Sequence, residues 1–317
     1  EMPGFVQLTV SPYKSISYAL QSPQARLANT GWNGFSKVDV VSSPSLHSLP
    51  GLSYQYLEPL PPIKGLFVDG DNLNAILPAD SNLSFADSMQ YAVAFSLQPD
   101  ADVLLLEPVG GFEVLTALEL GAQKVTAVVS NPLVVSAARE IYSLDKVSLV
   151  QARGRSFLAG TKHTFDIIQL PLTDSYHPVS SGAYALGEDY RYTVEGFTAM
   201  LDRLEPGGTL VITRWLQDEP SEWLRTFTLA VTALERFNVD PIKNIAALRG
   251  YNTGTLLIKK TGYSTGELEL IREFAQEKAF DLVYAPDLQM PEVNQFNILP
   301  EPVYYTTFQD FLSSKPK

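Results

Sequence analysis

The stretch ADVLLLEPVGGFEVLTALELGAQKVTAVVSN, from Ala101 to Asn131, decides the fold. Its first apolar run, VLLL, predicts a buried strand, and the pair Gly110-Gly111 predicts a turn directly after it. Apolar residues at helical spacing follow, and the run at 125–129 predicts a second strand. Strand, turn, helix and strand form a βαβ unit, and strands that are apolar throughout are typical of a parallel sheet covered on both faces. Because such sheets bind small molecules beyond the carboxyl ends of their strands, we expect a ligand at this glycine turn.

The alternation of strands and helices continues after this unit. We predict helices at 133–141, 193–204, 222–237 and 267–280, and strands at 147–150, 165–170, 209–213, 241–247 and 254–259. We expect the last two strands to form an antiparallel edge. This order predicts an α/β fold with a doubly wound, Rossmann-like sheet.

The residues before the βαβ unit follow another pattern, with short alternating runs between turns rich in serine and proline. They predict β-hairpins with strands at 5–10, 15–20, 26–28, 36–41 and 65–68, followed by a helix near 85–97. We therefore divide the chain into a small N-terminal β-domain, residues 1–80, and an α/β domain, residues 81–317.

The composition excludes several classes of function. Acidic residues outnumber basic ones by 35 to 23, and the net charge of −12 argues against nucleic acid or an anionic membrane as a partner. The absence of cysteine excludes disulfides and thiolate chemistry, and no paired histidines or spaced carboxylates predict a metal site. No apolar run approaches the roughly 20 residues of a membrane span, so we expect a cytoplasmic protein. The start at Glu1 and the abrupt polar end are compatible with the alternative of a soluble part of a longer, membrane-attached chain.

Taken together, these features resemble the polyamine aminopropyltransferase (spermidine synthase) family, which has a class I S-adenosylmethionine-dependent methyltransferase type of fold. The similar elements are SPY at 11–13, LFVDG at 66–70, Tyr91, the glycine turn, FDII at 165–168 and EPGGTLVI at 205–212. The resemblance implies S-adenosylmethionine or its decarboxylated form as the donor, a cationic amine as the acceptor, no metal, and a homodimer. Some relatives carry this domain beside membrane-spanning segments.

The resemblance also implies site residues. The donor-binding set is Glu107, Gly110, Gly111, Ser130 and Asn131, and the acceptor-binding set is Tyr13, Tyr91, Glu188, Asp189 and Tyr190. Carboxylates interleaved with aromatic rings suit a cation in the segment 184–192, although the same residues could pack and begin a helix. Asp174 is the implied catalytic carboxylate, because an amine must lose a proton before it can attack. Its alternatives are a helix cap or a solvated loop acid, and Glu107 could simply solvate its turn.

Several acids of the family are replaced in this chain. The replacements are Gly110 in the glycine turn, Val129 at the ribose position, Arg153 at the adenine position and Pro171 at the catalytic position. We therefore predict a spermidine synthase-like transferase fold that binds S-adenosylmethionine or a related nucleoside, with weak or lost aminopropyl transfer. The alternatives are a non-catalytic binding or structural module of a larger protein, a pseudoenzyme, and an S-adenosylmethionine-dependent methyltransferase.

Overall fold

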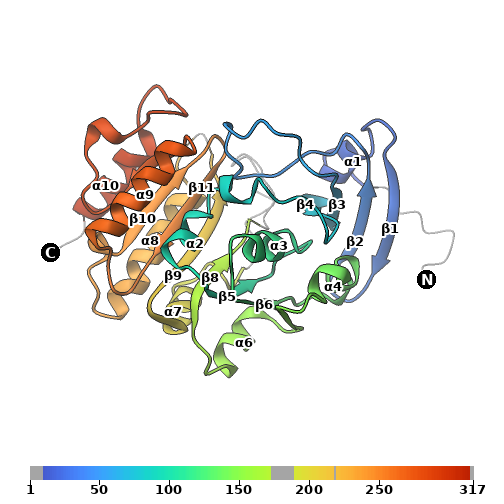
Figure 1. The fold of residues 1–317 in the computed structure, drawn as a ribbon, viewed down its shortest axis with the longest axis horizontal. Coiled ribbons are helices and arrows are strands. Elements are labelled where there is room, and N and C mark those ends of the chain that lie inside the picture. The colour runs from blue at the N-terminus through green and yellow to red at the C-terminus, as the bar shows by residue number, and fades with distance from the viewer. Residues whose placement is uncertain (1–9, 173–188, 218, 315–317) are drawn as a thin grey trace.

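The computed structural model describes residues 10–172, 189–217 and 219–314, which form two sheets flanked by helices (Figure 1). The smaller sheet is antiparallel throughout, with the order β1-β2-β3-β4. Its strands are β1 (Arg26–Trp32), β2 (Lys37–Ser42), β3 (Lys64–Val68) and β4 (Asp71–Ile76). The short helix α1 (Ser15–Ala19) packs against β3 and β4.

The larger sheet has eight strands in the order β12-β10-β11-β9-β8-β5-β6-β7. They are β5 (Asp102–Leu106), β6 (Lys124–Val128), β7 (Val147–Val150), β8 (Phe165–Leu170), β9 (Leu204–Trp215), β10 (Ile245–Arg249), β11 (Thr253–Ile258) and β12 (Asp281–Tyr284). Strands β5 to β9 are parallel, and β11, β10 and β12 continue the sheet in antiparallel pairs. The chain builds outward from β5 through β6 and β7 and then returns to β8 on the other side of β5. The carboxyl end of β5 is therefore the switch point at which such sheets bind ligands.

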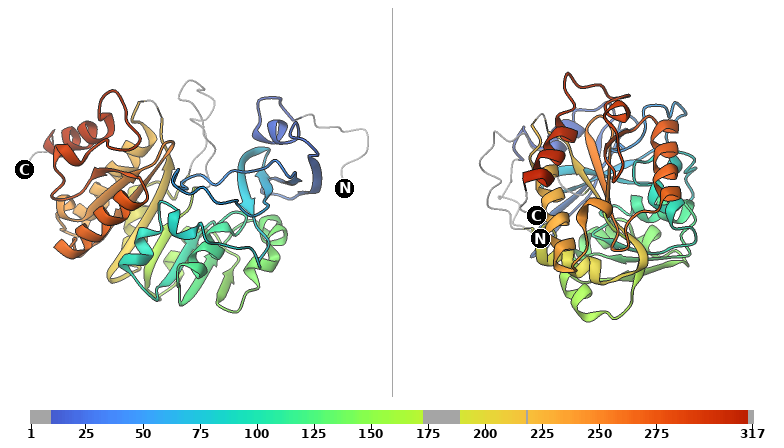
Figure 2. Two further views of the ribbon diagram at one scale, coloured as in Figure 1. Left: turned by 45° about the horizontal axis from the view of Figure 1, so that its top comes forward. Right: turned by 90° about the vertical axis from the view of Figure 1, so that its left-hand side faces the viewer.

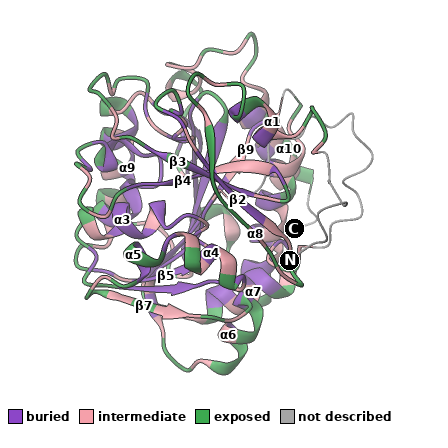
Figure 3. Cartoon of the chain, turned by 90° about the vertical axis from the view of Figure 1, so that its right-hand side faces the viewer, coloured by how far each residue is buried: buried purple, intermediate pink, exposed green. Residues whose placement is uncertain are grey.

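Two layers of helices cover the larger sheet because each buried strand presents apolar side chains to both faces. On β5, Val103 and Leu105 belong to one core, and Leu104 and Leu106 belong to the other. The first core contains apolar residues of α2 (Val93–Leu97), α3 (Phe112–Glu119), α4 (Pro132–Ala137), α5 (Arg139–Tyr142) and α9 (Thr265–Glu277). The second contains those of α6 (Gly154–Gly160), α7 (Val194–Asp202), α8 (Glu222–Arg236) and α10 (Val303–Ser314). Buried residues fill the inner strands, whereas β1 and β7 at the edges of the two sheets are exposed or half-buried (Figure 3).

The small sheet lies at one end of the molecule, and the antiparallel strands with α9 and α10 lie at the other (Figure 2). The predicted α/β class and the strand at 165–170 are confirmed, and the strands at 65–68 and 147–150 agree closely with β3 and β7. The strand predicted at 15–20 is wrong, because this segment is helix α1, whose Ile16 and Ala19 are buried at helical spacing. The predicted strand at 5–10 lies almost wholly outside the described residues. The division at residue 80 stays a prediction.

Four elements were not predicted from the sequence: strand β4, helix α6, strand β12 and helix α10. Helix α6 is short, β12 has only four residues, and α10 follows a long irregular segment, so none of these three carries a strong periodic pattern. Because β12 forms the edge of the sheet, the two strands that were predicted to form this edge, β10 and β11, each lie one position further inside it. Within the described ranges, no helix is both long enough and apolar enough to cross a membrane.

A contact between β11 and α8 gives a test of the packing. A Cβ atom added at Gly254 would lie 2.4 Å from Cε2 of the buried Trp223. We expect Gly254→Ala to lower the free energy of unfolding by about 1–3 kcal/mol, because the ring must move within a close-packed core. Urea denaturation measures this change. The control is Gly266→Ala at an exposed position in the first turn of α9, where a Cβ meets nothing within 4 Å. An equal effect in both variants would contradict the packing.

Candidate functional site

The carboxyl end of β5 turns sharply at Glu107, whose backbone is left-handed with a φ of +59°. The Glu107 N–H donates to the carbonyl of Val128 at 2.8 Å, and its Oε2 accepts from the N–H of Ser130 at 3.0 Å. The side chain thus joins the ends of β5 and β6. Ser130 also donates to the carboxylate through its side chain, so both hydrogen bonds to this carboxylate in the described part of the chain come from Ser130. Burial raises the pKa of Glu107, and the hydrogen bonds from Ser130 and the charge of Arg191 oppose that rise.

The glycine turn after Glu107 is approached closely by other parts of the chain. A Cβ at Gly110 would lie 2.5 Å from the carbonyl oxygen of Ala75 on β4. A Cβ at Gly111 would lie 2.9 Å from Cγ2 of Ile141 on α5. Both glycines also have positive φ angles, 86° and 74°. The glycine pair is therefore needed for the packing of β4 and α5, whether or not a ligand approaches the turn.

The end of β6 is tied to the small sheet through Asn131. Its Oδ1 accepts from the N–H of Leu133, which caps α4, and from Nδ2 of Asn33 at 2.8 Å. Its Nδ2 donates to Oγ of Ser36 at 2.8 Å. Both polar atoms of the predicted donor-binding Asn131 are thus engaged within the chain. Val129, which was predicted to stand at the ribose position, is fully buried in the core.

The predicted acceptor-binding acid Asp189 forms a bidentate ion pair with Arg191. Nε of Arg191 lies 2.9 Å from Oδ1 of Asp189, and Nη2 lies 2.6 Å from Oδ2. Burial alone would raise the pKa of Asp189, but the hydrogen bonds and charge of Arg191 lower it below its ordinary value. The guanidinium of Arg214 adds a second cation, 3.9 Å from the centre of the Tyr192 ring. Asp189 is therefore already paired with a positively charged side chain of the same chain, and the charge of Arg214 acts on it as well.

The remaining predicted residues are dispersed. Tyr13 is 85% exposed on the surface. Tyr190 is also exposed, with Arg155 over its ring. Asp174 and Glu188 lie outside the described residues. Among the described ranges, no group of three or more acidic or histidine side chains is placed to hold a metal ion.

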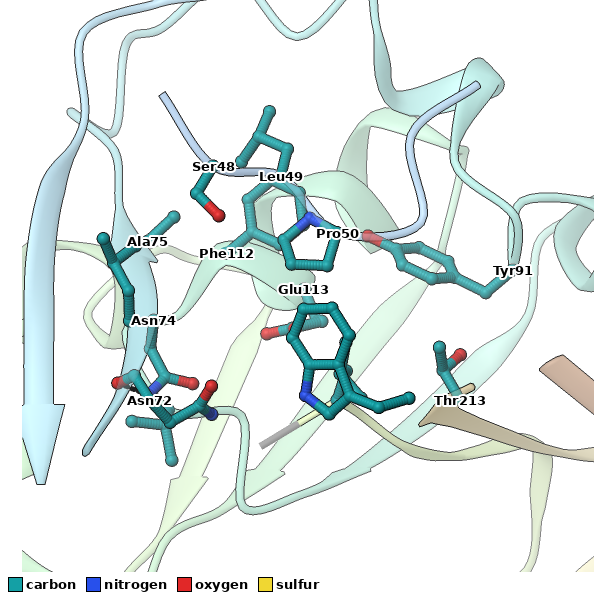
Figure 4. Close-up of a pocket in the computed structure, with 14 residues that line it drawn as sticks. Ser48, Leu49, Pro50, Asn72, Asn74, Ala75, Tyr91, Phe112, Glu113 and Thr213 are labelled. Atoms are coloured by element: carbon teal, nitrogen blue, oxygen red, sulfur yellow. Dashed lines mark hydrogen bonds between the residues drawn. The ribbon is translucent and has the colours of Figure 1, made fainter. Parts of the chain in front are cut away.

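A narrow cavity of about 30 Å³ lies between β4, α3, the end of β9 and the loop at 48–50 (Figure 4). Its polar and aromatic lining includes Asn72, Asn74, Tyr91, Glu113, Thr213 and Trp215. The buried Tyr91 donates to or accepts from Thr116 through its hydroxyl, at 2.8 Å. The volume has room for about two water molecules, so the cavity fits a small polar group and not a whole nucleoside.

Glu113 is the residue of this cavity that the sequence analysis missed. Its Oε2 is buried and has no hydrogen-bond partner in the part of the chain that the structure describes. Burial raises the pKa of Glu113 to about 7. The available signal was a carboxylate inside the apolar helix FEVLTALEL, directly after the glycine turn. An acid in the first turn of a helix is ordinarily explained by its favourable interaction with the helix dipole. The position of Glu113 in the sequence therefore does not by itself indicate a functional role.

The pKa of Glu113 predicts a pH-dependent cost in stability. Because the folded-state pKa lies above the ordinary 4.5, the wild type loses stability as the pH rises from about 4.5 to about 7 and keeps that deficit above it. Glu113→Gln should thus be more stable than the wild type at pH 8, by roughly 1–3 kcal/mol, and equally stable at pH 4.

Urea denaturation at pH 4, 6 and 8 measures this difference. Glu119→Gln is the matched control, because it removes an exposed carboxylate at the end of the same helix. A Glu113→Gln variant whose stability difference is the same at pH 4 and pH 8 would show that the carboxyl titrates normally.

No protein-family model matches this chain, and no curated protein matches it significantly. Solved structures do match. Spermidine synthase from Thermotoga maritima aligns with a TM-score of 0.52 and 14% identity, covering 91% of this chain and 86% of that one. A spermidine synthase in complex with the transition-state analogue AdoDATO aligns with a TM-score of 0.50, the same identity and the same coverage. A probable spermidine synthase from Corynebacterium glutamicum aligns with a TM-score of 0.52 and 14% identity, covering 78% of this chain and 87% of that one. The chain therefore has a spermidine synthase-like fold of the class I S-adenosylmethionine type.

Proposed function

We propose that this chain binds a nucleoside of the S-adenosylmethionine type at the carboxyl ends of β5 and β6, and that it does not transfer an aminopropyl group. The observation that carries the proposal is the geometry of Glu107. Its left-handed backbone and its bond to the Ser130 N–H fix the carboxylate at the switch point of the sheet. A carboxylate has about four acceptor sites, so Glu107 can accept a further hydrogen bond from a ligand hydroxyl or ammonium group beside those from Ser130.

The loss of transfer is supported by what surrounds Glu107. An aminopropyl acceptor is a cationic amine that must be held by carboxylates and deprotonated. Asp189 is instead paired with Arg191, whose charge also acts on Glu107. The positive charge of Arg191 repels the cationic amine, and its partly exposed pair with Asp189 would have to be broken before Asp189 could hold that amine.

A second candidate function is that of a non-catalytic structural module. It is favoured by the contacts of the glycine turn and Asn131, because each is explained by packing inside the chain. Gly110 lets the backbone of β4 approach closely, and Asn131 forms hydrogen bonds with Asn33 and Ser36 in the turn between β1 and β2. The two candidates differ in a single property, which is affinity for a nucleoside.

Calorimetric titration with S-adenosylmethionine, its decarboxylated form and methylthioadenosine tests the first candidate. We expect a Kd tighter than about 100 μM, near −5.5 kcal/mol, for at least one of them. Glu107→Gln should weaken it by about tenfold or more, because a charge-assisted hydrogen bond is replaced by a neutral one. The amide oxygen of the substituted side chain can still accept from the Ser130 N–H, so the turn is kept. Glu119→Gln is the matched control. No binding of any of the three would favour the structural module, and binding that Glu107→Gln leaves unchanged would place the ligand elsewhere.

The absence of aminopropyl transfer has its own test. We expect no spermidine and no methylthioadenosine to form when the chain is incubated with decarboxylated S-adenosylmethionine and putrescine, because Asp189 is held by Arg191. Mass spectrometry detects both products, and an active aminopropyltransferase serves as the positive control. Turnover above the level of a heat-inactivated sample would overturn this half of the proposal.

A further inference from the structure

A large open groove beside the turn between β10 and β11 is a feature that the proposed function does not use. Its volume is about 1200 Å³, and it is bounded by the end of β9, this turn, the loop at Tyr54 and the segment 296–304. Among the described residues, Trp215 is the only one that lines both this groove and the cavity at Glu113. The groove is therefore distinct from that cavity, and it is large enough to hold a small organic molecule.

Three exposed apolar side chains converge on the groove from distant parts of the chain. Tyr54 is 64% exposed, Tyr251 is 71% exposed and Ile298 is 74% exposed. The rings of Tyr54 and Tyr251 lie edge to face, with 5.8 Å between their centroids. Single exposed apolar side chains are normal on a protein surface, but several that gather in one hollow indicate a binding site.

One wall of the groove is held in place by a buried carboxylate. Asp281 is 1% exposed, and its oxygens accept the backbone N–H groups of residues 295–297 at 2.6–2.9 Å. The buried guanidinium of Arg249 pairs with the same carboxylate at 3.1 Å. These contacts fix the segment that presents Ile298 to the groove. A ligand therefore meets a wall that is already formed and loses little affinity to ordering it.

The groove offers no positive charge to a ligand. Arg249 is the one cation among its described lining residues, and it is buried against Asp281. Glu301 is the one acid in the same set, and it is exposed. An anion in the groove would lack a partner and would meet the charge of Glu301. An uncharged ring would bury its faces against aromatic side chains, and the amide of Asn252 could bind a polar substituent on it.

We propose that this groove binds an uncharged aromatic molecule against Tyr54, Tyr251 and Ile298, and that it rejects an anion of the same shape. The contacts that carry the binding are ring stacking and apolar burial, which require no charge on the ligand. The inference goes beyond the proposed function and does not require a nucleoside at Glu107.

The fluorescent dyes N-phenyl-1-naphthylamine and 1-anilinonaphthalene-8-sulfonate form a matched pair, because they share the same ring systems and differ by one sulfonate group. The protein is titrated into a low, fixed concentration of each dye. We expect the uncharged dye to bind the wild type with a Kd of about 100 μM or tighter, and the sulfonate to bind at least about tenfold more weakly. Tyr54→Ala and Tyr251→Ala should each weaken the uncharged dye by about fivefold or more. Both tyrosines are exposed, so both variants should fold as the wild type does.

Tyr18→Ala is the matched control, because it removes an exposed tyrosine from α1, outside the groove. Lack of binding of the uncharged dye to the folded wild type would overturn the inference. Equal affinity for the two dyes, or an affinity for the uncharged dye that Tyr54→Ala and Tyr251→Ala leave unchanged, would also overturn it.

A competition experiment separates this inference from the proposed function. Saturating methylthioadenosine should leave the affinity for the uncharged dye unchanged. Displacement of the dye by the nucleoside would assign the groove to the nucleoside and overturn the inference. Calorimetry that detects no nucleoside binding, together with the expected dye results, would overturn the proposed function and support the inference.

Discussion

The close approach between β4 and the glycine turn after β5 is the constraint on which the rest of the structure depends. The carbonyl of Ala75 lies where any side chain at Gly110 would have to begin. Because the position carries no Cβ, the small sheet can rest directly on the switch point of the large sheet. The cavity at Glu113 exists between these two sheets and is closed on one side by β4. Asn131 strengthens the same junction through Asn33 and Ser36.

The larger sheet could be predicted from the sequence because its information is local. Each parallel strand is an apolar run buried on both faces, and each main helix has its own 3.6-residue periodicity. The N-terminal region was harder to predict, since α1 is a five-residue helix within a segment that alternates almost like a strand. Strand β12 and helix α10 were missed because their burial comes from tertiary contacts, including the packing of Phe308 on Phe227.

Only the part of the candidate site that lies directly at the end of a strand could be predicted from the sequence. The position of Glu107 follows from the run before it and the glycines after it. In the sequence, Asp189 and Arg191 are only two neighbouring opposite charges. Their spacing does not tell whether they pair with each other or bind a ligand, and the structure shows that they pair. Glu113 could not be identified from the sequence, because the strands β4 and β9 that line its cavity are distant from it along the chain.

The central claim is that a nucleoside occupies the crevice at the carboxyl ends of β5 and β6. The most direct measurement is a crystal structure of the chain grown with saturating methylthioadenosine. The account predicts a ribose hydroxyl at about 3 Å from Oε1 of Glu107, with β4 still packed on Gly110. Density for the nucleoside at another place, or an empty crevice at saturating ligand, would contradict it.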